Sequence, residues 1–118
     1  MYEITLDRLP PSVNHAYIIV ANRGRVRRFK SKEASDYFQY IKEECNKQLG
    51  IVELLECPIK FNADVTFGDR RKRDLDNTQK VLLDAFSGVI WKDDSQVIEI
   101  HMTKTVGKNH GIKVKVEW

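Results

Sequence analysis

The chain has 118 residues, of which 42% are hydrophobic and 31% are charged, and its 20 Lys and Arg exceed its 17 Asp and Glu by three. This length predicts one domain over residues 1–118, and the apolar fraction excludes a disordered or low-complexity chain. A net charge of +3 is too small to indicate a partner, so the placement of charges along the chain is more informative.

No apolar run approaches the ~18–20 residues that a helix needs to cross a bilayer. Glu3 stands where a signal peptide would carry basic residues. The two cysteines, Cys45 and Cys57, lack the spacing of a zinc site or a redox pair. Because secreted chains of this size are often crosslinked by disulfides, the sequence predicts a cytoplasmic protein with reduced thiols and no membrane partner.

The first predicted elements are strands. Residues 2–6 alternate apolar and polar side chains, which is typical of a half-buried strand. Residues 14–20 and 25–29 flank the sequence Asn-Arg-Gly, in which Gly tolerates positive φ. This pattern predicts a β-hairpin with its turn at residues 22–24.

Two helices are predicted from apolar periodicity. Ser31 is suited to cap the first helix and Gly50 to end it. The second begins between Asp74 and Asn77 and runs to about Ser87. Apolar residues at three- and four-residue intervals give the first helix one buried face, made of Ala34, Phe38, Ile41, Cys45 and Leu49.

Three more strands complete the order, over residues 58–67, 96–105 and 112–118. Alternate residues of the first of them are apolar, which predicts one buried face. The order of elements predicts an α+β fold: a single two-layer domain with a mixed β-sheet and two α-helices on one face.

A run of basic residues leads directly into two carboxylates, Asp74 and Asp76. Residues two apart share one side of an extended segment but not of a helix, so these carboxylates converge only where the chain is extended or enters a helix. Clustered carboxylates suit Mg²⁺ or Mn²⁺, and basic side chains bind phosphate oxygens. Together they are typical of metal-assisted phosphodiester hydrolysis in a nucleic acid. The basic run consists of Arg70, Arg71, Lys72 and Arg73.

Each of these patterns also has a structural interpretation. Asp76 and Gln79 match a capping box at a helix start. Asp76 and Lys80 are spaced for a solvated ion pair on one helix face. Asp93 and Asp94 are typical of turn residues between the second helix and the next strand.

Three segments carry a family resemblance: residues 9–14 (LPPSVN), 71–80 (RKRDLDNTQK) and 91–97 (WKDDSQV). They resemble the RusA family of Holliday junction resolvases, whose pattern is P-P-S-x-N, then R-D-x-D-N-x-x-K, then a D-D-x-x-V-like stretch. The resemblance implies a RusA-like fold and a homodimeric endonuclease, dependent on Mg²⁺ or Mn²⁺, that nicks four-way DNA junctions on two opposing strands. Such proteins are often encoded by phages and prophages.

The resemblance also implies roles for single residues. Asp74, Asp76 and Asp94 would be the catalytic carboxylates that bind the metal. Lys80 would be the essential catalytic lysine, and it faces the same side as Asp76 because it follows one helical turn later. There it would either stabilise the pentacovalent phosphate or protonate the leaving 3′ oxygen. Arg73 would be the arginine that precedes the first aspartate.

A second basic cluster lies between residues 23 and 32, without an acidic residue among its members. It is either a solvated hairpin edge that discourages strand pairing or a surface that contacts the DNA backbone. Beside a nuclease site we favour the second, with DNA bound by Arg25, Arg27 and Arg28 together with Arg70, Arg71, Lys72 and Arg73. Trp91 is predicted to pack beside the acidic pair rather than to stack on a base.

The sequence therefore predicts a Mg²⁺-dependent crossover junction endodeoxyribonuclease of recombination and repair. The alternatives are a DNA-binding regulator without catalysis and a metal-dependent nuclease acting on other branched substrates. One set of site residues per chain supplies one nick, whereas a junction needs two, so we expect a homodimer matched to the two-fold symmetry of the junction. The dimer is also expected to cover apolar surface left open on the sheet.

Overall fold

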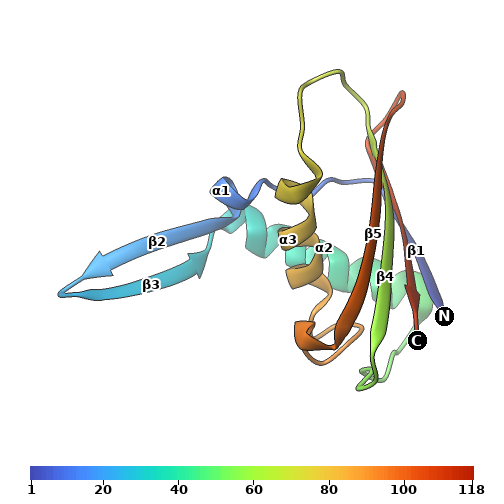
Figure 1. Cartoon of the computed structure of the whole chain (residues 1–118), viewed down its shortest axis with the longest axis horizontal. Helices are drawn as coiled ribbons and strands as arrows, with labels where there is room; N and C mark the ends of the chain where they lie inside the picture. The colour runs from blue at the N-terminus through green and yellow to red at the C-terminus, as the bar shows by residue number, and fades with distance from the viewer.

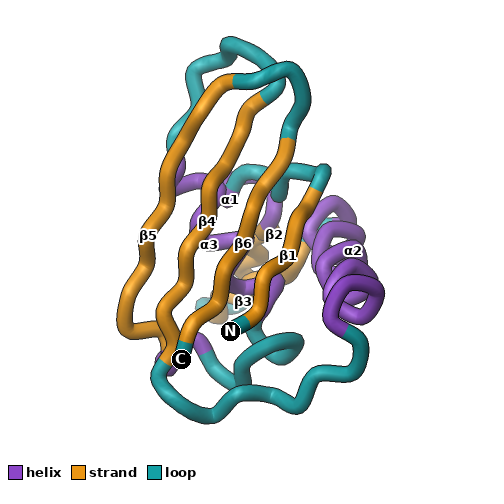
Figure 2. The backbone as a smooth tube through the Cα atoms, turned by 90° about the vertical axis from the view of Figure 1, so that its right-hand side faces the viewer, coloured by secondary structure: helices purple, strands orange, loops and turns teal.

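The computed structural model describes all 118 residues, and its main sheet has four strands. They are β1 (Tyr2–Leu6), β4 (Ile59–Phe67), β5 (Val97–Val106) and β6 (Gly111–Glu117), in the spatial order β1-β6-β4-β5. Strand β4 pairs parallel with β5 and antiparallel with β6, which in turn pairs antiparallel with β1. The predicted mixed sheet is confirmed, and Figure 2 shows its four strands side by side.

Helices α2 (Lys32–Leu49) and α3 (Leu75–Phe86) both lie on one face of this sheet, as predicted (Figure 2). The Ser31 side chain accepts a hydrogen bond from the Ala34 backbone N–H at 3.1 Å, which satisfies a free donor at the start of α2. Gly50 ends α2 at φ 75°, a conformation that side chains other than glycine disfavour. Both ends of α2 are therefore fixed by local chemistry.

The core lies between the sheet and the helices. Alternate residues of β4, from Ile59 to Phe67, are buried, as the pattern predicts. Phe61 packs against Phe86 of α3 and the edge of Trp91, with ring centroids about 6 Å apart in both pairs, 6.0 Å and 5.9 Å. Because α3 packs through this aromatic group, the position of its exposed face is fixed by the core.

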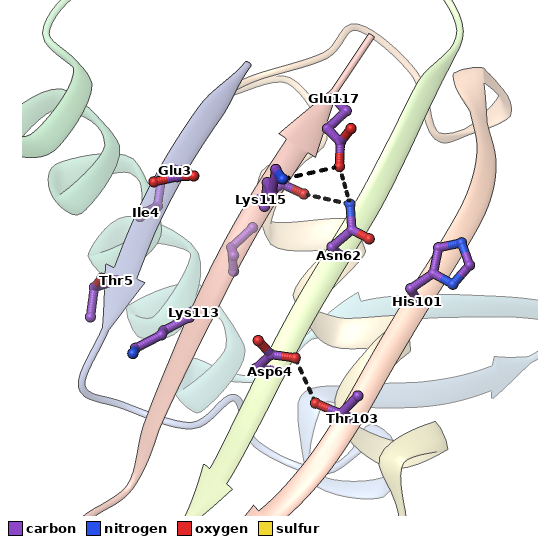
Figure 3. Close-up of a pocket in the computed structure, with 11 residues that line it drawn as sticks. Glu3, Ile4, Thr5, Asn62, Asp64, His101, Thr103, Lys113, Lys115 and Glu117 are labelled. Carbon is purple, nitrogen blue, oxygen red and sulfur yellow. Dashed lines mark hydrogen bonds and ion pairs between the residues drawn. The ribbon is translucent and has the colours of Figure 1, made fainter.

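The opposite face of the sheet is open and polar, which corrects the expectation of exposed apolar surface there. Figure 3 shows charged and polar side chains from all four strands on this face. Several pair with one another: Asn62 donates to Glu117 at 3.2 Å, and Thr103 donates to Asp64 at 2.6 Å. Side chains of a strand alternate between its two faces, so the apolar set that fills the core leaves the polar set outside.

A second, two-stranded sheet projects from the molecule. Strands β2 (Tyr17–Asn22) and β3 (Arg25–Lys30) form an antiparallel hairpin that extends away from the main sheet (Figure 1). Its turn has positive φ at Arg23 and Gly24, 51° and 77°. We call residues 17–30 the arm. Every residue from 18 to 30 is exposed.

The structure corrects the start of this hairpin. Residues 13–16, predicted in part as strand, form the single-turn helix α1 (Val13–Ala16). The Ser12 carbonyl accepts hydrogen bonds from the backbone N–H groups of His15 and Ala16, and Ala16 is fully buried. Packing of Ala16 thus outweighs the strand pattern. A short 3₁₀ helix, η1 (Asp94–Gln96), was also not predicted. None of the helices has the length and apolar character to cross a bilayer.

Candidate active site

The first two candidate carboxylates lie at the start of α3. Asp74 is the residue before the helix, with extended backbone at φ −104° and ψ 135°, and its side chain makes no capping hydrogen bond. Asp76 lies in the first turn. Both are exposed. The predicted position at the helix entrance is confirmed, and the capping box that Asp76 and Gln79 resemble is not formed, because the helix begins one residue before Asp76.

The exposed face of α3 carries Lys80 and then Asp84. The Lys80 Nζ lies 2.9 Å from Asp84 Oδ1, so Lys80 pairs with Asp84 rather than with Asp76 as in the alternative interpretation. The hydroxyl of Tyr17, at the base of the arm, also donates to Asp84. Asp84 was not predicted as a site residue. Its position four residues after Lys80, which places both on one helix face, could have indicated it.

Asp94 begins η1 and is half-buried. The indole Nε1–H of Trp91 donates to Asp94 Oδ1 at 2.9 Å, and Trp91 itself is fully buried, so its predicted packing role is confirmed. Burial raises the pKa of Asp94, and the neighbouring Asp84 carboxyl raises it further, although the Trp91 hydrogen bond opposes both. Asp94 therefore lies with Asp84 and near Lys80, at the end of α3 away from Asp74.

Asp93 has a structural role. Its side chain accepts from the backbone N–H of Ser95, and the Gln96 side chain accepts from the Asp93 N–H at 2.8 Å, which completes a capping box on η1. Hydrogen bonds from Ser95 lower the pKa of Asp93. Of the two adjacent aspartates, Asp94 is the one that lies near Asp84 of α3.

The basic run is not uniform. Arg73 forms a two-point pair with Asp69, with Nη2–Oδ2 at 2.8 Å and Nε–Oδ1 at 3.2 Å. Its guanidinium also lies over the Phe67 ring, 5.2 Å from the centroid. Arg73 holds the pKa of Asp69 at about 2. The other three members are exposed and face solvent: Arg70, Arg71 and Lys72.

Two of the segments quoted for the family resemblance meet in a small cavity of about 220 Å³. The N-terminal segment supplies Leu9, Pro10 and Ser12. The stretch leading into α3 and its first turn supply Lys72, Arg73, Asp74, Asn77 and Thr78. These segments are far apart in sequence. Their contact places the Pro-Pro-Ser segment next to Asp74.

The side chains at this site are chemically suited to a hard divalent cation, since carboxylate oxygens are its preferred ligands. No group of three or more His, Cys, Asp or Glu side chains is gathered closely enough to hold an ion. Mg²⁺ usually binds one or two carboxylates together with water and substrate phosphate, so the ligand chemistry fits without such a group. The structure does not bring Asp74, Asp76 and Asp94 together in one such group, and this metal set stays a prediction.

The three arginines of the arm that are predicted to bind DNA do not share one face. Opposite residues in the hairpin share a face, and the register Val20↔Arg27 and Ile19↔Arg28 puts Arg27 and Arg28 on opposite faces. Arg25 shares the face of Arg27. The Arg28 guanidinium instead lies over the Tyr17 ring, 4.2 Å from its centroid.

Comparisons with known proteins show the family of this chain. The family profile described as Endodeoxyribonuclease RusA matches residues 9–117. The chain belongs to the RusA family. It is 38% identical over 105 residues to the crossover junction endodeoxyribonuclease RusA of Escherichia coli strain K12. The matched residues cover 87% of this chain and 82% of the relative.

Two further members of the RusA family extend the range of sources. The crossover junction endodeoxyribonucleases of Shigella sonnei strain Ss046 and of Enterobacteria phage 82 are each 36% identical, with the same shares of both chains covered. The predicted family, with its endodeoxyribonuclease description, is confirmed. The phage relative fits the expectation that such proteins occur in phages and prophages.

Proposed function

We propose that this protein is a metal-dependent endodeoxyribonuclease that resolves four-way DNA junctions by paired symmetric nicks. The observation that carries the proposal is the exposed face of α3 in a RusA-family chain. Carboxylates lie at both ends of this face, with Lys80 between them and the basic run at the helix start. Such a face combines groups suited to phosphate binding with groups suited to metal binding.

Asp74, Asp76 and Asp94 would hold Mg²⁺ or Mn²⁺, which when bound polarises a phosphoryl oxygen as a Lewis acid. The ammonium group of Lys80 stabilises negative charge that develops on the phosphate. The side chains of Arg70, Arg71 and Lys72 bind backbone phosphates on either side of the cut.

The proposed active form is a homodimer that acts in the cytoplasm. Large apolar side chains are exposed on the arm, including Ile19 at 69% and Val26 at 72%. A two-stranded hairpin without further packing is at best marginally stable in water. A second copy of the chain packed against the arms would cover these side chains and supply the second active site that paired nicks require.

The proposed activity is tested by incubating the protein with a labelled four-way junction, a linear duplex or a single strand, each with Mg²⁺, Mn²⁺ or EDTA. We expect paired nicks on the junction alone, with none in EDTA. Tight junction binding without cleavage under either metal would instead identify a DNA-binding regulator. Cleavage that favours flaps or RNA would identify a nuclease with another substrate.

The proposed dimer is tested by sedimentation equilibrium at micromolar concentration. We expect twice the 13.8 kDa mass of one chain, and a shift toward the monomer when Ile19 and Val26 are both replaced by Ser. A monomer mass that junction DNA leaves unchanged would contradict the dimer.

A further inference from the structure

Asp84 lies near the C-terminal end of α3. None of the three segments that resemble the RusA family includes it. Its carboxylate pairs with Lys80 at 2.9 Å and accepts a hydrogen bond from the Tyr17 hydroxyl. The Asp94 carboxyl is a further neighbour, and its pKa is raised by its own burial and by Asp84. Its two bonded partners come from α3 and β2, and the neighbouring Asp94 comes from η1.

Packing alone does not require a carboxylate at position 84. Only 17% of the Asp84 side chain is exposed, against 49% of the Lys80 side chain. A half-buried carboxylate next to a second one is unfavourable because like charges repel and both lose hydration. Residues placed in such surroundings cluster at functional sites. A neutral side chain of the same size would fill the space without this repulsion.

Lys80 gains a defined position from the contact. A lysine side chain on the surface of a helix is long and flexible and samples many rotamers. The pair with Asp84 holds its Nζ on the exposed face of α3. Without Asp84, nothing else in the structure pairs with the Lys80 ammonium.

The same carboxylate connects the site to the arm. Tyr17 is the first residue of β2, and its hydroxyl reaches across to α3 while Arg28 of β3 lies over its ring. The base of the arm is therefore attached to the site through Asp84. No other side-chain hydrogen bond joins the arm to α3.

We propose that Asp84 is a positioning residue of the active site, which holds the Lys80 ammonium beside Asp94 and anchors the base of the arm through Tyr17. Asp84 acts through Lys80 and does not itself touch the phosphate. This inference rests on the proposed nuclease function, since Lys80 matters only if cleavage occurs.

The first experiment compares Asp84→Ala with a matched control, Asp7→Ala. Asp7 also accepts a tyrosine hydroxyl, that of Tyr40 at 2.6 Å, but lies away from α3. Under single-turnover conditions with prebound junction, we expect Asp84→Ala to slow cleavage about 10- to 100-fold, as a misplaced catalytic group does. Because the junction is prebound, any loss of affinity caused by a loosened arm does not enter this rate. Equal cleavage rates for the two variants would overturn the proposal.

A double-mutant cycle separates positioning from a general structural effect. If Asp84 acts through Lys80, then Asp84→Ala should cause no further loss in a Lys80→Ala background, because the two substitutions disturb one interaction. The same 10-fold or larger loss in both backgrounds would contradict this. If Asp84→Ala does not fold, Asp84→Asn is measured instead, since Asn keeps the size and an acceptor for Tyr17 but lacks the charge that holds Lys80.

The connection to the arm has a readout that needs no cleavage. Asp84→Ala and Tyr17→Phe should both speed amide hydrogen exchange at residues 17–19 and 28–31, whereas Tyr40→Phe should not. Unchanged exchange in both variants would exclude the anchor. If the wild-type protein cleaves no junction while the exchange changes as expected, the nuclease function fails and the anchor stands, so the two failures are distinguishable.

Discussion

The exposed face of α3 and the arm both carry charged residues proposed to act on DNA, but they are held in different ways. Helix α3 packs on the core through buried side chains that include Val81, Leu82, Ala85 and Phe86. The arm has no buried residue between positions 18 and 30 and extends away from the body (Figure 1). One surface is rigidly positioned, and the other is held only at its base.

This difference indicates a division of roles. Chemistry on phosphate requires groups fixed to within a fraction of an ångström, which a helix packed on a core provides. Binding to the DNA backbone requires mainly positive charge, which an exposed hairpin provides without such precision. Substitutions on α3 should therefore change cleavage of bound junction, and substitutions on the arm should change binding.

The largest effect is expected from removing the carboxylates. Asp74→Asn, Asp76→Asn and Asp94→Asn should each reduce cleavage by at least about 10⁴-fold, since a bound metal stabilises the transition state by several kcal/mol. Junction binding should be kept or strengthened because a negative charge near phosphate is lost. Rate measurements and gel-shift titrations check both parts, with Asp64→Asn on the open sheet face as the control. Cleavage that survives in these variants would show that the acids are structural.

The next largest effect is expected from removing the buried Trp91 side chain, which packs beneath the site. Trp91→Ala should reduce the free energy of unfolding by about 3–5 kcal/mol, as expected when a buried aromatic side chain is removed. It also removes the hydrogen-bond donor to Asp94. The matched control is Trp118→Ala, because Trp118 is 51% exposed. Urea denaturation measures both, and similar midpoints for the two variants would contradict the core placement of Trp91.

A smaller effect is expected on the arm. Arg25→Ala combined with Arg27→Ala should weaken junction binding about 10-fold and reduce the slope of log affinity against log salt by about 2, one for each lost phosphate contact. Cleavage of prebound junction should be unchanged. The control is the pair Lys42→Ala and Lys47→Ala on α2. Equal losses in both pairs would mean that the arm contributes only general charge.

The smallest effect concerns the one member of the basic run that is held in place. Arg73 depresses the pKa of Asp69 to about 2, so the pair contributes most above the ordinary Asp value and is lost as pH falls toward 2. In Arg73→Gln the Asp69 titration midpoint should rise toward ~3.9. Carboxyl carbon NMR follows the titration, and an unchanged midpoint would exclude the ion pair in solution.

Local patterns in the sequence predicted the elements whose ends depend on neighbouring residues. Ser31 and Gly50 define α2 because capping bonds form within a few residues of the helix ends. The alternation in β4 predicted its buried face. The family pattern predicted Asp74, Asp76, Lys80 and Asp94 as site residues without any structure, because the pattern lies within short segments.

Contacts between distant segments could not be predicted from the sequence. Whether Lys80 pairs with Asp76 or with Asp84 is undecided by spacing, because both lie four residues away; the structure selects Asp84, where Tyr17 of the arm and Asp94 of η1 also converge. Val13–Ala16 became a helix turn because Ala16 is buried, which no local pattern reveals. The sequence by itself determined the family and the ends of α2, and it predicted the chemical groups of the site. Only tertiary packing decided which of those groups meet, because their proximity depends on how α3, η1 and the arm lie on the core.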